Sequence, residues 1–195
     1  KMSGYKKKVN GLEIEMGNKS QIMGVSLKDD PDKVRGKAGE LIFFEEAGSF
    51  PGLLKAWEVA MPTMRQGNKT LGTMVAFGTG GTKGAGFSGM EELFYNPDAY
   101  DCLSFENVWD DGARGTTCGH FVPIYENLEG FIDDDGNSNA QLAIEFEEGN
   151  RNKKKGTNDP KAYDQYIAEH PMCPAEATLQ VSGNLFDIGS LQEQY

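Results

Sequence analysis

The sequence has 195 residues, of which 38% are hydrophobic and 25% charged, and its formal net charge is −11 at pH 7. This length suits one domain, or one domain and a part of another, and can supply a hydrophobic core. No run approaches the ~18 apolar residues that cross a bilayer, so we expect no membrane partner. This negative net charge argues against a free-standing binder of duplex DNA, because the surface of such a protein should be basic.

The charge is unevenly distributed along the chain. Residues 1–37 contain nine Lys/Arg against five Asp/Glu, whereas the remaining residues contain ten against twenty-five. Any contact with phosphate is therefore expected near the start. Three cysteines without the spacing of a disulfide framework indicate reduced thiols, as in a cytosol. The sequence begins at Lys1 without an initiator methionine, and we expect it to be a fragment of a longer protein.

The first part of the chain predicts strands. Residues 1–10 are basic and form a tail, a loop or a piece of a larger element. Leu12–Met16 alternates apolar and charged residues, which is typical of a strand with one wet face. The turn signal Gly17-Asn18 then predicts a hairpin with Gln21–Leu27 as its second strand. The short apolar run Leu41–Phe44 predicts a strand buried on both faces of a parallel sheet.

Two adjacent carboxylates, Glu45 and Glu46, follow this last strand. Open α/β sheets bind their ligands at the carboxyl ends of their strands. Carboxylates are costly there unless they pair, bind a metal or take part in proton chemistry. The pair therefore predicts a functional site, and the alternative is that both residues mark where the strand leaves the core.

A helix and a second strand are predicted next. Ser49 is a plausible helix N-cap, and apolar residues recur at helical spacing over 51–66, with a kink at Pro62. Leu71–Phe77 predicts a second buried strand, which ends in the glycine-rich loop Gly78–Gly84. Strand, helix and strand of these lengths predict a βαβ unit.

The second half of the sequence predicts mainly helices. They are expected over residues 88–95, 139–155 and 159–169, with a short strand near 101–105. His120–Ile124 is expected to be an extended edge segment, because Pro123 cannot donate a ladder hydrogen bond. Asp133–Asp135 lacks the spacing of an EF-hand and predicts a solvated loop. Cys118-x-His120 and His170-x-x-Cys173 have a poor spacing for structural zinc.

Several motifs occur together at consistent spacing. They are Lys19–Gly24, Val34-Arg35-Gly36, Leu41–Glu46, Val75–Gly81, Cys118–Pro123, Asp135-Gly136-Asn137 and His170–Ala177. In this order the set resembles the large subunit of the tailed-phage terminase, an ATP-driven DNA-packaging motor, over about residues 18–180. Leu41–Glu46 is similar to its Walker B strand, and the strand ending in Gly78-Thr79 is similar to its coupling motif.

The resemblance implies a fold, site residues and partners. It implies an α/β fold: part of a P-loop NTPase sheet of the additional-strand type with flanking helices, followed by a small linker subdomain. It also implies a role for each motif residue. Glu45 would hold Mg²⁺ through water and Glu46 would activate the hydrolytic water, while Gly78 and Thr79 would sense the γ-phosphate of ATP and Arg35 would act as an arginine finger on a neighbouring subunit. The alternatives for Arg35 and Thr79 are a surface arginine that pairs with Asp29, Asp30 or Asp32, and a loop threonine that caps the next turn. The implied partners are double-stranded DNA, the portal protein, the small terminase subunit and neighbouring subunits of a ring, in the host cytoplasm.

The departures from this family define what the chain lacks. No G-x-x-x-x-G-K-[ST] phosphate loop (Walker A) occurs, and Glu45 stands where the family usually has Asp. We therefore expect residues 1–117 to be the later part of the ATPase core and residues 118–195 the linker toward a nuclease domain. Two alternatives remain, namely a non-enzymatic assembly module and a metal-dependent hydrolase that uses Glu45, Glu46 and Asp133–Asp135.

Overall fold

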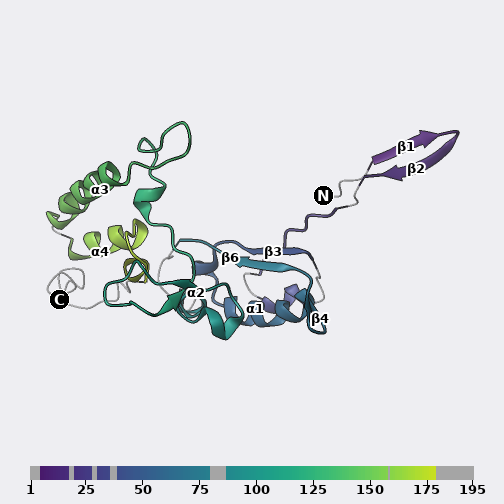
Figure 1. Ribbon diagram of the computed structural model, residues 1–195, viewed down its shortest axis with the longest axis horizontal. Helices are drawn as coiled ribbons and strands as arrows, with labels where there is room; N and C mark the ends of the chain where they lie inside the picture. The colour runs from purple at the N-terminus through teal and green to yellow at the C-terminus, as the bar shows by residue number, and fades with distance from the viewer. Residues whose placement is uncertain are drawn as a thin grey trace.

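The protein combines helices with small β-sheets, so it belongs broadly to the α/β class. A computed structural model describes residues 5–17, 20–27, 30–35, 39–79, 87–157 and 159–178. Figure 1 shows a projecting hairpin, a central part in which a small sheet lies on helices, and a second group of helices beside it. Within these residues, no helix is both long and apolar enough to cross a membrane.

The projecting hairpin consists of β1 (Tyr5–Val9) and β2 (Leu12–Met16), which pair antiparallel. We call this hairpin the arm. Its turn is Asn10-Gly11, whose positive φ angles of 52° and 80° fit the tight turn that Asn-Gly favours. The predicted hairpin of Leu12–Met16 with Gln21–Leu27 is therefore wrong, because the chain at Asn10-Gly11 already provides β2 with an antiparallel partner.

The central part is built on β3 (Leu41–Phe44) and β6 (Thr73–Ala76), which pair parallel with Phe44 opposite Ala76. Helix α1 (Leu53–Ala60) lies between them in the chain, so the predicted βαβ order is confirmed. The helix ends before Pro62, and the chain continues as a 3₁₀ helix over Met61–Met64. A small hairpin of β4 (Arg65–Gln66) and β5 (Lys69–Thr70) then leads to β6.

The hydrophobic core lies on one side of this sheet. Helices α1 and α2 (Phe87–Tyr95) lie beneath β3 and β6 in Figure 1. Phe44 packs against Trp57, with ring centroids 5.7 Å apart, and Leu53 is fully buried. The two helices approach closely because Gly89 is small: a Cβ there would lie 3.4 Å from the Cβ of Leu53.

The opposite face of the sheet is open. Leu41 is 51% exposed and Phe43 61% exposed, whereas Phe44 is buried. The prediction that Leu41–Phe44 is buried on both faces is therefore wrong. The strand alternates instead, because α1 and α2 cover only one side of it (Figure 1). Among the described residues, no helix lies over the open face.

Short elements connect the central part with the last helices. Pro97–Tyr100 is a 3₁₀ helix, and β7 (Phe105–Glu106) pairs antiparallel with β8 (Thr117–Cys118). The strand predicted near 101–105 thus starts only at Phe105. Residues 119–123 form no strand, which corrects the predicted edge segment, and Ile124–Glu126 is a 3₁₀ helix. Two further 3₁₀ helices are Pro31–Val34 and Ala47–Ser49.

The second group of helices consists of α3 (Ala140–Lys155), α4 (Pro160–Glu169) and α5 (Pro174–Ala177), which we call the helical unit. The first two confirm the helices predicted over 139–155 and 159–169. Side chains cap both: Asn139 accepts from the backbone N–H of Leu142, and Asp159 accepts from that of Lys161.

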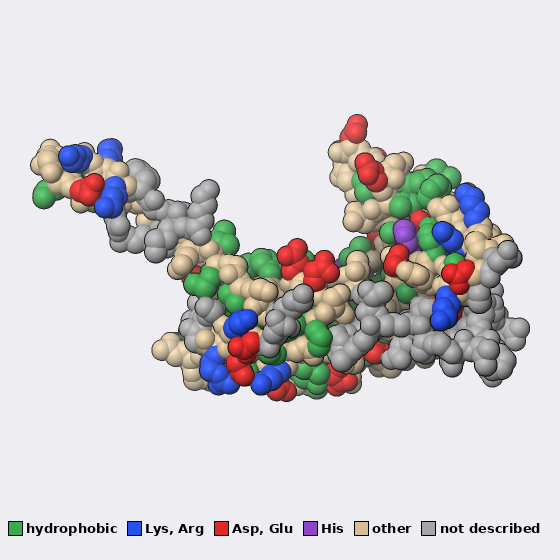
Figure 2. Space-filling model, turned by 180° about the vertical axis from the view of Figure 1, so that it is seen from behind, with side chains coloured by type: hydrophobic (Ala, Val, Ile, Leu, Met, Phe, Trp, Pro, Cys, Tyr) green, Lys and Arg blue, Asp and Glu red, His purple; other side chains and the backbone are tan. Residues whose placement is uncertain are grey.

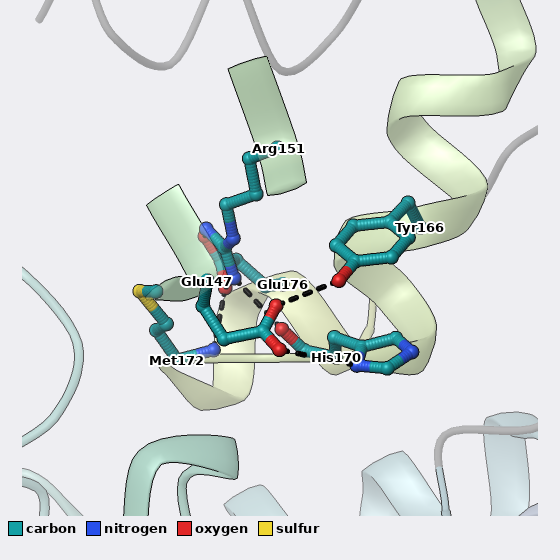
Figure 3. A network of polar contacts seen from close by, with 6 residues as sticks. All are labelled: Glu147, Arg151, Tyr166, His170, Met172 and Glu176. Carbon is teal, nitrogen blue, oxygen red and sulfur yellow. Dashed lines mark hydrogen bonds and ion pairs between the residues drawn. The ribbon is translucent and has the colours of Figure 1, made fainter. Parts of the chain in front are cut away.

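A buried polar network holds these helices together (Figure 3). Glu147 is 1% exposed and accepts a hydrogen bond of 2.8 Å from the Tyr166 hydroxyl. Burial, followed by the hydrogen bond to the neighbouring Glu147, raises the pKa of Tyr166. Arg151 donates to both carboxylate oxygens of Glu176, at 2.6 and 2.8 Å, and to the carbonyl of His170. The network therefore joins α3, the end of α4 and α5.

Candidate functional site

The carboxyl ends of β3 and β6 meet at one edge of the sheet. The backbone N–H of Phe77 donates to the carbonyl of Phe44, and that of Ala47 donates to the carbonyl of Phe77, each at 3.0 Å. These two bonds continue the parallel ladder beyond the strands. They place the turn that contains Glu45 and Glu46 against the segment that contains Gly78.

Gly78 allows this close approach. Its φ is 155°, and a Cβ at this position would lie 3.0 Å from the backbone N of Ala47 and 3.2 Å from the Cα of Glu46. Both neighbours are backbone atoms, which cannot turn aside as a flexible side chain can. A glycine is therefore required where the second strand passes the acidic turn.

Glu46 has an unusual backbone conformation, with φ 56° and ψ 35° in the left-handed region. Asn and Asp tolerate this region, as Asn10 and Asp101 do here, but for other side chains it costs roughly 1–2 kcal/mol. Strained residues of this kind cluster at functional sites. Glycine would adopt this conformation without strain, so Glu46 is the residue at this edge whose backbone marks it as a candidate.

The side chains of this acidic pair, Glu45 and Glu46, are exposed and available. Within the described residues, no hydrogen bond or ion pair involves either carboxylate. Carboxylate oxygens in this state can accept hydrogen bonds from water, including water bound to Mg²⁺, which keeps several waters in protein sites. The pair thus fits the outer shell of a magnesium ion.

The other predicted site residues are exposed as well. Thr79 follows Gly78 directly, and Gly80–Gly84, the rest of the predicted glycine-rich loop, lies outside the described residues. Arg35 donates to Asp32 at 2.9 Å, and Asp32 also pairs with Lys55 of α1 at 3.1 Å. Hydrogen bonds from Arg35 and then Lys55 lower the pKa of Asp32. Arg35 thus makes an exposed ion pair with Asp32 near the start of α1, which is the contact expected of a surface arginine.

A groove of about 390 Å³ lies elsewhere on the central part. It follows five consecutive residues, Gly72–Ala76, along β6, and it contains neither the acidic pair nor Gly78 or Thr79. Met61, Met64 and Met90 contribute to its apolar lining. Because β6 pairs only with β3 in the described part of the chain, the groove marks the unpaired edge of the sheet.

The alternative metal ligands are engaged in other contacts. Asp133 accepts from the backbone N–H groups of Asp135 and Asn137 and from the Asn137 side chain, so this loop is closed by its own hydrogen bonds. Those bonds lower the pKa of Asp133, that from the Asn137 backbone most. The ring of His120 lies 5.2 Å from that of Phe105, and Cys118 is buried. Among the described residues, no three His, Cys, Asp or Glu side chains form a metal-binding group.

Sequence reasoning missed Asp110, which joins distant parts of the chain. Its carboxylate accepts from the Tyr95 hydroxyl at 3.1 Å, from Asn107 at 3.0 Å and from the backbone N–H of Ala175 at 2.9 Å. It thereby links α2 to the start of α5. The last contact spans 65 residues, and no local pattern around Asp110 indicates it.

Comparisons with known proteins do not identify a relative: no family model, curated protein or solved structure matches the chain.

Proposed function

We propose that this chain is part of an ATP-driven viral DNA-packaging motor of the terminase large-subunit type, acting in the host cytoplasm. The supporting observation is that the parallel pair β3–β6 brings Glu45 and Glu46 together with Gly78 at one edge of the sheet. The acidic pair comes first in the chain, the crossover helix α1 second and Gly78-Thr79 third. This is the order that the family resemblance predicts.

The proposed chemistry is phosphoryl transfer to water, in which a protein mainly positions groups and stabilises charge. Glu45 would help to hold Mg²⁺ through water, and Glu46 would orient or deprotonate the attacking water. Bound Mg²⁺ supplies positive charge that offsets the charge of the β- and γ-phosphates. Thr79 directly follows Gly78, which approaches the acidic turn, and it would transmit the loss of the γ-phosphate toward the DNA-gripping parts.

The free edge of β6 supports a larger sheet. A two-stranded parallel sheet is unusual by itself, because parallel sheets are normally extended and covered. The apolar groove along Gly72–Ala76 leaves room for a further strand beside β6. A P-loop sheet needs such a strand to carry its phosphate-binding loop, which this sequence lacks. The chain by itself is therefore expected to hydrolyse ATP only at background rate.

In this proposal, Arg35 contributes to catalysis only when several subunits are assembled in a ring. Its exposed guanidinium is held by Asp32 near α1, on the surface of the central part. In a ring of subunits, an arginine in this position can reach a neighbour's nucleotide, where such a residue is worth about 10³–10⁵ in rate. Double-stranded DNA, the portal protein and the small subunit are the further partners of the assembled motor.

Two experiments test the proposal. The gene that encodes this chain should also encode G-x-x-x-x-G-K-[ST] upstream, and its absence would favour the assembly module instead. In the full gene product, Glu46→Gln should lower DNA-stimulated ATP turnover by about 10²-fold or more while leaving ATP binding intact. Glu126→Gln, far along the chain, is the matched control and should leave turnover unchanged.

A metal titration of this chain distinguishes the proposed ATPase site from the alternative of a metal-dependent hydrolase. Mg²⁺ and ATP are expected in the full-length protein, and neither is expected to bind tightly to this chain, which lacks Walker A. Excess Mn²⁺ with ATP should nevertheless broaden the backbone amide NMR signals of residues 45–47 and 78–79 through weak binding, and Glu45→Gln should reduce the effect. Broadening centred on Asp133–Asp135 would instead favour the metal-dependent hydrolase.

A further inference from the structure

The arm has one apolar face that its own chain leaves exposed. The register of β1 and β2 puts Lys7, Val9, Leu12, Ile14 and Met16 on the same face. Leu12 is 70% exposed, and the other three apolar residues are also exposed. The opposite face is polar and includes the ion pair of Lys6 with Glu13 at 3.2 Å. An isolated two-stranded hairpin is at best marginally stable in water, so the arm needs a partner surface.

The central part has an apolar surface of similar form. Leu41 and Phe43 of β3, with Val75 and Phe77 on and just after β6, share the open side of the sheet, and we call these four residues the open sheet face. The rings of Phe43 and Phe77 contact edge to face, with centroids 5.8 Å apart. Like the arm, this surface is two strands wide and four to five residues long.

The charges around the two surfaces are complementary. Lys7 lies within the apolar face of the arm, whose residues 5–16 carry three Lys against two Glu. Exposed Glu40, Glu45 and Glu46 flank β3 at its two ends. In Figure 2, hydrophobic and acidic side chains lie side by side on the surface between the arm and the helical unit. The positive charge of Lys7 on the apolar face of the arm is therefore complementary to the glutamates beside the open sheet face.

We propose that the arm of one copy packs face to face on the open sheet face of a second copy of this chain. Stacked sheets pack about 10 Å apart with interdigitated side chains, which would bury Leu12 and Ile14 against Phe43 and Phe77. A second copy fits better than the same copy because the arm points away from the central part (Figure 1). The contact is formed mainly by apolar side chains of the arm and of the open sheet face, so it does not rest on the proposed function.

The contact is heterologous, since the arm and the open sheet face are different patches. Each copy can offer its arm to one neighbour and its open sheet face to another, which produces rings or open chains. The mass measured by sedimentation equilibrium should therefore rise with concentration above that of two chains. Leu12→Asp in the arm, or Phe43→Asp in the open sheet face, should return it to that of one chain. Lys8→Ser, on the polar face of the arm, is the control and should keep the oligomer.

Mixing the two defective variants distinguishes lost contacts from misfolding. The Leu12→Asp variant retains its open sheet face, and the Phe43→Asp variant retains its arm, so an equimolar mixture should form a complex of two chains and no larger species. A mixture that stays at the mass of one chain overturns the proposal. A wild-type chain that is monomeric at all concentrations, or an oligomer that survives Leu12→Asp, overturns it as well.

Discussion

Glu147 is buried and Glu176 partly buried among α3, α4 and α5, whereas Glu45 and Glu46 stand exposed at the end of β3. The first two bind Tyr166 and Arg151, which come from different helices (Figure 3). The second two have no partner in the described part of the chain, and one of them has a strained backbone. The first two carboxylates hold three helices together, whereas the exposed pair makes no such contact within the described residues, and this difference is consistent with the proposed role of the pair.

Removing a carboxylate that pairs with a buried arginine should have the largest effect. Glu176→Ala would leave Arg151, which is 9% exposed, without its bidentate partner. We expect the free energy of unfolding in urea to fall by about 3–5 kcal/mol, because an unpaired buried charge is costly. Glu169→Ala, at the exposed end of α4, is the control and should change it by less than about 0.5 kcal/mol. Equal effects of the two variants would contradict the distinction between the two groups of carboxylates.

The close approach of Gly78 to the acidic turn gives a second test. Gly78→Ala places a Cβ against the backbone of Ala47 and Glu46, so the turn must move. We expect a loss of about 1–3 kcal/mol in unfolding free energy, as for other overpacked sites. At Gly24 a Cβ would meet nothing within 4 Å, so Gly24→Ala should be nearly neutral. A neutral Gly78→Ala would mean that the acidic turn is not held against β6.

At the acidic pair itself, a change should stabilise the protein. Glu46→Gly relieves the left-handed strain and should raise the free energy of unfolding by up to ~1 kcal/mol. Glu45→Gln should change it by less than about 0.5 kcal/mol. Destabilisation by either variant would show that the pair has a structural role, contrary to the comparison with Glu147 and Glu176.

The sequence predicts the elements better than it predicts their surroundings. The apolar run at Leu41–Phe44 and the helical spacing around Trp57 were sufficient for the βαβ order, because both patterns are local. Asn10-Gly11 carried the signal for the arm, and it is a stronger hairpin turn than Gly17-Asn18. Whether the outer face of β3 is covered depends on other elements of the fold, so the apolar run could not reveal it.

The candidate site, too, could be predicted from the sequence only as far as its local elements. The position of Glu45 and Glu46 after a strand could be predicted, as could that of Gly78 after the next strand. Their contact depends on the register of β3 with β6, and the left-handed conformation of Glu46 has no sequence signature. The contact of Arg151 with Glu176 joins residues 25 apart on different helices, which composition and spacing do not indicate.

The smallest expected effect concerns two thiols. Cys102 lies beside the central part, and Cys173 lies in the helical unit. Burial, and then the charge of Asp101, raises the pKa of Cys102 to about 11, and burial is likewise the main cause that raises the pKa of Cys173 to about 11. Both thiols should therefore react with iodoacetamide several times more slowly at pH 8 in the folded protein than in urea.

The same shifts make stability depend on pH. The folded state keeps these protons up to about pH 11, while the unfolded state releases them near the ordinary value of 9.0, so the free energy of unfolding should fall as pH rises between these values. Cys173→Ala should remove part of this slope. Since Cys173 lies at the start of α5 and Cys102 beside the central part, faster labelling of only one thiol would show which region opens more readily.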